Sequence, residues 1–169
     1  MFKLNFLKMR TQLALKKNKT LRGSIPYPQA RSVGIIFTVE NKQKHYDIKD
    51  FIHLLELDGK RVHVLEYLPE TKENYEFLFD FFTWKDISFW GQHNSEKAIK
   101  FYETAFDYLF CIDTQSNPLV LDLVARSKAR CRVGRFNESE SCFFEMMIEQ
   151  NSTTKGLIET MYKYIRKLR

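Results

Sequence analysis

The chain has 169 residues, 44% of them hydrophobic, and a formal net charge of +6 at pH 7. This length predicts one domain with a substantial core, since chains of about 150 residues remove roughly 70% of their unfolded surface from water. The composition argues against a disulfide-rich secreted protein and a membrane-spanning protein, because cysteines are few and no apolar run approaches the roughly 20 residues that cross a bilayer. We therefore expect a cytoplasmic protein without a signal peptide, with reduced and buried thiols at Cys111, Cys131 and Cys142.

Basic residues are concentrated at the N-terminal end. Residues 1–31 contain eight basic and no acidic residues, whereas the remainder contains 19 basic and 21 acidic residues. A helix is predicted over residues 2–19, which lack proline and glycine. At helical spacing, the apolar residues form two stripes on nearly opposite sides of this helix. Two stripes indicate two contacts, one with the domain and one with a partner, a second copy or a membrane surface. The apolar residues of the two stripes are Phe2, Phe6, Met9 and Leu13, and Leu4, Leu7, Ala14 and Leu15.

The second contact of this helix has several interpretations. The simplest is an ordinary helix that covers a sheet edge. One alternative is an anionic membrane surface, which would place the protein peripherally at the inner membrane. The others are RNA or the ribosome, an unknown protein partner, and a second copy of the chain in a homodimer. Contact with an anionic surface would use the basic residues Lys3, Lys8, Arg10, Lys16, Lys17 and Lys19.

The sequence divides into a basic amphipathic helix at residues 1–22, a connector at 23–31 that contains glycine and proline, and one Rossmann-like domain at 32–169. Apolar periodicity predicts strands over 32–38, 61–68, 75–81, 108–112, 130–134 and 141–148. It predicts helices over 46–57, 95–105, 118–127 and 154–168, with residues 40–44 as a polar loop. The aromatic segment at 81–91 has neither period, so we predict an irregular loop that is either packed over the sheet end or forms a lid, with packing preferred.

The centre of the chain is the strand, helix and strand at residues 106–137. Asn117 before Pro118 is the N-cap and N1 signature of a helix start. A strand, a helix and a strand within about thirty residues predict a right-handed crossover. The fold class we predict is α/β, a three-layer Rossmann-like fold with a mostly parallel sheet of about five strands, helices on both faces and the N-terminal basic helix.

Two resemblances follow from these segments. FDYLFCID at residues 106–113 and PLVLDLVARSKARCRVG at 118–134 resemble the strand-helix-strand of the N-terminal domain in heptosyltransferase-type glycosyltransferases. That resemblance implies nucleotide-sugar binding, although nothing after Phe37 matches the Ser/Gly/Asp loop of those enzymes and a second nucleotide-sugar domain has no counterpart in the 169 residues. Through SVGIIF, FFTWKDISFWG and SKARCRVG, the chain is also similar to a family of small uncharacterised bacterial proteins.

A ligand site, if the fold carries one, is expected at the carboxyl ends of the strands. The candidate ligand-binding residues there are Asp113, Asn117, Gly134 and Arg135, with Asp113 as acceptor for a sugar or ribose hydroxyl and Arg135 as phosphate partner. Pro118 removes one donor from the helix start that would hold an anion. The alternative is structural, with Asp113 capping its loop and Arg135 solvated.

Motifs for catalysis, cofactors and metals are missing from the sequence. It has no GxGxxG, no GxxxxGK[ST], no HExxH and no CxxC, so we expect no catalytic residue, no cofactor and no metal. Our first hypothesis is a non-enzymatic binding or interaction protein that contacts a partner through its basic N-terminal helix. The alternative is a nucleotide or nucleotide-sugar binding domain related to glycosyltransferases.

Overall fold

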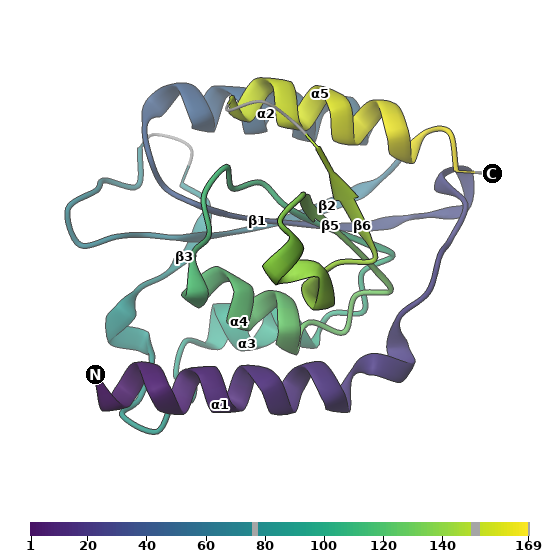
Figure 1. Ribbon diagram of the computed structural model, residues 1–169. Coiled ribbons are helices and arrows are strands. Elements are labelled where there is room, and N and C mark those ends of the chain that lie inside the picture. The colour runs from purple at the N-terminus through teal and green to yellow at the C-terminus, as the bar shows by residue number, and fades with distance from the viewer. Residues whose placement is uncertain (76–77, 150–152, 169) are drawn as a thin grey trace.

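The computed structural model describes residues 1–75, 78–149 and 153–168. Its strands form one all-parallel sheet in the order β3-β2-β1-β4-β5-β6 (Figure 1). The predicted α/β class with a parallel sheet is confirmed, and the described residues form six strands rather than about five. The strands are β1 (Ser32–Thr38), β2 (Arg61–Tyr67), β3 (Asp80–Phe82), β4 (Tyr108–Cys111), β5 (Cys131–Arg135) and β6 (Met146–Ile148).

The helices are arranged in layers about this sheet (Figure 1). One side carries α2 and α5, the other carries α3 and α4, and α1 lies outside α3 and α4. The predicted N-cap Asn117 is confirmed, because its Oδ1 accepts from the Leu119 N–H. Ser95 caps α3 in a similar way, since its Oγ accepts from the Ala98 N–H. The helices are α1 (Phe2–Lys17), α2 (Lys42–Leu57), α3 (Glu96–Glu103), α4 (Pro118–Arg126) and α5 (Thr154–Ile165).

The two sides of the sheet enclose two hydrophobic clusters. Along β1, Val33, Ile35 and Phe37 belong to the cluster under α2 and α5, whereas Ile36 belongs to the cluster under α3 and α4. This alternation follows from the two-residue side-chain period of a strand. Both faces of β1 are buried, as its nearly continuous apolar run predicts for a central parallel strand.

Two predicted strands are shorter than expected. The strand predicted over 75–81 is β3 at Asp80–Phe82, and residues 76 and 77 lie outside the described residues. The strand predicted over 141–148 begins only at Met146, because Glu138–Phe143 forms a 3₁₀ helix that Asn137 caps. A strand from 141 would send Phe143 and Phe144 to opposite faces, yet both pack into the cluster under α3 and α4.

Two further expectations are corrected. The polar loop predicted at residues 40–44 ends early, because α2 starts at Lys42, with the Asn41 side chain accepting from the Lys44 N–H. Cys142 is exposed rather than buried, since it lies in the 3₁₀ helix that replaces the predicted strand. Cys111 and Cys131 are buried free thiols, as predicted, and burial raises the pKa of Cys131 to about 12.

No helix within residues 1–75, 78–149 and 153–168 combines the length and the apolar composition that crossing a membrane requires.

Candidate functional site

The carboxyl ends of β1 and β4 are joined by a polar cluster around Asp113. Asp113 Oδ1 accepts from the Thr38 N–H at 2.7 Å and from Lys44 Nζ at 2.8 Å. Asp113 Oδ2 accepts from Thr38 Oγ1 at 2.7 Å. Lys44 also pairs with Glu40 at 2.7 Å, and only 2% of Lys44 is exposed. Both oxygens of Asp113 are therefore bonded to donors of the chain itself, which is the arrangement expected of a buried carboxylate.

The other predicted site residues lie close to this cluster. Asn117 donates to Thr38 Oγ1 at 2.9 Å while it caps α4, and the Arg135 guanidinium donates to the Phe136 carbonyl at 3.5 Å. A Cβ at Gly134 would lie 2.5 Å from the Phe144 ring, so this glycine makes room for an aromatic side chain.

The space between these residues is small. The hollow lined by Asp113, Asn117 and Arg135 measures about 10 Å³, room for one water at most. A larger hollow of about 360 Å³ lies between the first turns of α2 and α5, beside Lys44 and Lys155. The structure thus brings Asp113, Asn117 and Arg135 together, and their role in binding a ligand stays a prediction.

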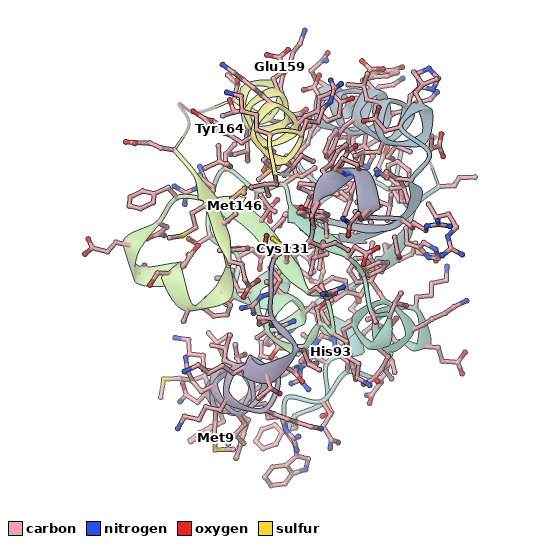
Figure 2. The ribbon with its side chains drawn as sticks, turned by 90° about the vertical axis from the view of Figure 1, so that its right-hand side faces the viewer. Met9, His93, Cys131, Met146, Glu159 and Tyr164 are labelled. Carbon is pink, nitrogen blue, oxygen red and sulfur yellow. The ribbon has the colours of Figure 1, made fainter. Side chains whose placement is uncertain are left out.

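A second candidate site is the outer face of α1. The stripe of Leu4, Leu7, Ala14 and Leu15 faces inward and packs with the cluster under α3 and α4. We call the opposite stripe, Phe2, Phe6, Met9 and Leu13, the outer stripe. The exposed fractions of Phe2, Met9 and Leu13 are 65%, 53% and 59%. Figure 2 shows Met9 on the side of α1 that faces away from the rest of the molecule.

An aromatic turn extends the outer stripe. We call residues 88–91 the aromatic turn, in which the Gly91 N–H donates to the Ser88 carbonyl at 3.0 Å. Phe89 and Trp90 at its tip are 55% and 59% exposed. The ring centroid of Phe6 lies 5.8 Å from that of Phe89 and 5.0 Å from that of Trp90. Two segments about eighty residues apart in sequence therefore form one exposed apolar surface.

The aromatic turn is fixed against α1 by its backbone. Gly91 has φ +70°, and a Cβ there would lie 2.7 Å from the backbone nitrogen of Leu7. Arg10 Nε donates to the Trp90 carbonyl at 2.6 Å, and Arg126 Nη2 donates to the Gly91 carbonyl at 3.0 Å. The position of the two exposed rings is therefore set by bonds from α1 and α4.

A buried carboxylate lies behind this surface. Asp122 of α4 accepts from Thr11 Oγ1 at 2.6 Å, from Arg126 Nε at 2.7 Å, and contacts His93 Nε2 at 2.7 Å. Burial alone would raise the pKa of Asp122, but the bonds from His93 and Arg126, the charge of Arg126 and the bond from Thr11 together hold it below 3.8. Asp122 thus ties α1 and α4 to the segment after the aromatic turn, in which its partner is His93, labelled in Figure 2.

Sequence reasoning missed both the aromatic turn and this carboxylate. It interpreted residues 81–91 as packing or a lid, whereas Phe82 and Ile87 are buried and Phe89 and Trp90 are exposed. One signal was available for Asp122, since it is the only acid in the apolar helix predicted at 118–127 and had to find a partner.

The outer stripe is bordered by positive charge on both sides. Lys8 and Lys16 lie along one edge of α1, and Arg10 and Lys17 along the other. Lys8, Lys16 and Lys17 are exposed, and residues 1–31 contain no acid to neutralise them. The surface therefore combines apolar and aromatic side chains with a cationic border.

The comparisons with known proteins identify a family for this chain, but that family has no known activity. The family model described as "Family of unknown function (DUF6913)" matches residues 3–168. No curated protein and no solved structure matches the chain significantly. The bacterial origin and the resemblance to heptosyltransferase-type glycosyltransferases stay predictions, whereas the predicted family of unknown function is confirmed. The chain belongs to this family of unknown function, DUF6913.

Proposed function

We propose that the protein is a non-enzymatic binding module that docks peripherally on an anionic membrane surface through the outer stripe of α1 and the aromatic turn. One observation carries this proposal: Phe6 joins the exposed stripe to the exposed Phe89 and Trp90, and the joined surface has a cationic border. A helix that lies in a membrane interface has this combination of an apolar face, aromatic rings and basic flanks.

The chemistry of the surface favours lipid over other partners. Tryptophan and phenylalanine are suited to the boundary between headgroups and acyl chains, and Met9 and Leu13 add aliphatic groups that offer no stacking face to a nucleic-acid base. Each basic residue near an anionic surface contributes about 1 kcal/mol of attraction. The apolar and the cationic parts of the surface then act together on the same bilayer.

A second copy of the chain fits this surface less well. In a two-fold contact through α1, the cationic borders of both copies would face each other, and residues 1–31 supply no acid to compensate them. An anionic bilayer has the opposite charge and places no demand on shape, which suits a convex helix beside a protruding turn.

Co-sedimentation with lipid vesicles tests the proposal. We expect the full chain to sediment with phosphatidylcholine vesicles that contain phosphatidylglycerol, to bind pure phosphatidylcholine weakly, and to dissociate as salt rises from 0.1 to 0.5 M, where screening shortens the reach of surface charge.

A matched pair of variants distinguishes binding through this surface from nonspecific adsorption through any exposed apolar side chain. Leu13→Ser removes an apolar group from the outer stripe, whereas Leu57→Ser removes one that is 70% exposed at the end of α2, on the opposite side of the sheet. We expect Leu13→Ser to weaken vesicle binding and Leu57→Ser to leave it unchanged. Equal effects of the two variants, or equal binding to neutral and anionic vesicles, would contradict the proposal.

A further inference from the structure

A groove of about 300 Å³ opens beside the outer stripe, between α1, α3 and the end of α4. Its lining contains four cations and, among the described residues, one carboxylate. The cations come from two places in the chain: Arg10 and Lys17 of α1, and Arg126 and Lys128 at the end of α4.

The two arginines in the groove are held in place by the protein. Arg10 Nε and Arg126 Nη2 donate to the carbonyls of Trp90 and Gly91, and Arg126 Nε also donates to Asp122. These bonds leave other donors on both guanidinium groups, because each carries five N–H groups in all. A positioned guanidinium is a suitable partner for the oxygens of a phosphate group.

The two lysines complete the charge of the groove. Lys128 forms an ion pair with Glu103, the carboxylate of the lining. Lys17 is exposed and lies two turns along α1 from Arg10, on the same side of the helix. The positive charge of the lining exceeds its negative charge by three, so the groove attracts an anion rather than a neutral ligand.

The position of the groove identifies the source of that anion. Leu13 belongs both to the outer stripe and to the groove lining. When the outer stripe lies at the boundary between headgroups and acyl chains, the groove faces the layer of lipid phosphates. From this geometry, and resting on the proposed membrane docking, we propose that the groove binds the phosphate group of an anionic lipid headgroup.

The test compares adjacent lysines of α1. Lys17 lines the groove, whereas Lys16 lies on the other border of the outer stripe and does not. Loss of either lysine removes one charge near the bilayer, which lowers vesicle affinity about fivefold. Lys17→Ala also removes a charge-assisted bond to phosphate, so we expect its vesicle affinity to fall about tenfold or more, with the same result for Lys128→Ala.

A soluble probe separates the groove from the docking surface. Dihexanoyl phosphatidylglycerol, kept below its micelle concentration, is titrated into the full-length protein by calorimetry, and inorganic phosphate is titrated in parallel. We expect the lipid probe to bind the wild-type protein and Lys16→Ala alike, to bind Lys17→Ala at least about tenfold more weakly, and to bind more tightly than inorganic phosphate.

Four results would overturn the inference. Equal losses of vesicle affinity in Lys16→Ala and Lys17→Ala mean that Lys17 contributes only its charge near the bilayer and no bond to phosphate in the groove. Equal binding of inorganic phosphate and the lipid probe makes the groove a site for free phosphate. If the wild-type protein binds vesicles but not the soluble probe, the groove is not a lipid-phosphate site, and the docking proposal stands. If the wild-type protein does not bind vesicles, both the docking proposal and the lipid assignment of the groove are contradicted.

Discussion

At the scale of single residues, Asp122 explains how a charged group can lie in the core of this protein. Its side chain is fully buried, and its oxygens contact three side chains from three segments. A buried carboxylate with fewer partners would destabilise the fold or become protonated. The bonds around Asp122 offset that cost and fix α1 and the segment after the aromatic turn in one arrangement.

The lowered pKa of Asp122 predicts a specific dependence of stability on pH. Because the folded pKa lies below 3.8, ionised Asp122 contributes stability that is present above pH 3.8 and is lost as pH falls through the lowered folded value. Asp122→Asn lacks this contribution. Urea unfolding at pH 7 and at pH 2.5 should therefore show a large difference in unfolding free energy between wild type and Asp122→Asn at pH 7 and a smaller difference at pH 2.5. A difference that does not shrink in acid would contradict this.

Gly91 is predicted to be more sensitive to substitution than another glycine of similar conformation. Gly59 has φ +76° with nothing within 4 Å of an added Cβ, whereas the added Cβ at Gly91 would meet the backbone of Leu7 at 2.7 Å. Gly59→Ala should cost about 1 kcal/mol from backbone strain alone. We expect Gly91→Ala to cost more in urea unfolding, and to weaken vesicle binding because it displaces the aromatic turn from α1. Equal costs for the two variants would show that the contact with Leu7 is unimportant.

At the scale of elements, α1 has a separate task on each of its two apolar stripes. The inner stripe completes the cluster under α3 and α4, so deleting the helix would expose the core and could not test the outer stripe alone. Point substitutions on α1 distinguish the two roles.

Two leucines of α1 test this division. Leu7 is 1% exposed and Leu13 is 59% exposed. Leu7→Ala should lower the free energy of unfolding by about 2–4 kcal/mol, because it leaves a cavity in a packed cluster. Leu13→Ala should change it by less than about 0.5 kcal/mol and should weaken vesicle binding instead. Guanidinium unfolding of both variants checks the stability, and a large loss of stability in Leu13→Ala would contradict the assignment of the stripes.

Elements with strong local signals were predictable from the sequence. Asn117 and Pro118 mark the start of α4, and the apolar run at Tyr108–Cys111 marks a strand buried on both faces. The start of α2 was not predictable from periodicity, because the side chains buried in its first turn are polar, Lys44 and His45. A lysine can be buried there only because Asp113 and Glu40 bind its ammonium group, and both pairings depend on the folded chain.

The candidate surface was predictable only in part. The two stripes of α1 follow from the helical period, and the cationic border follows from composition. The sequence does not indicate which stripe faces the domain, because both contain four apolar residues. The contact of Phe6 with Phe89 and Trp90 joins segments far apart in the chain, so it depends on the way the segment before α3 folds back onto α1.

At the scale of the whole molecule, the docking surface occupies one side of a layered fold. Figure 1 places α1 on the opposite side of the sheet from α2 and α5. The excess positive charge also belongs to the N-terminal segment, since the rest of the chain has slightly more acidic than basic residues. Docking through α1 would therefore turn the positive side of the molecule toward an anionic bilayer and leave α2 and α5 facing water.

The fluorescence of Trp90 tests this account most directly. The chain has two tryptophans, and Trp84→Phe leaves Trp90 at the tip of the aromatic turn as the single reporter while keeping an aromatic ring beside Lys3. We predict that anionic vesicles shift the Trp90 emission to shorter wavelength, and that lipids carrying a quencher just below the headgroup reduce its intensity. Unchanged and unquenched emission across all vesicle concentrations would contradict docking through this surface.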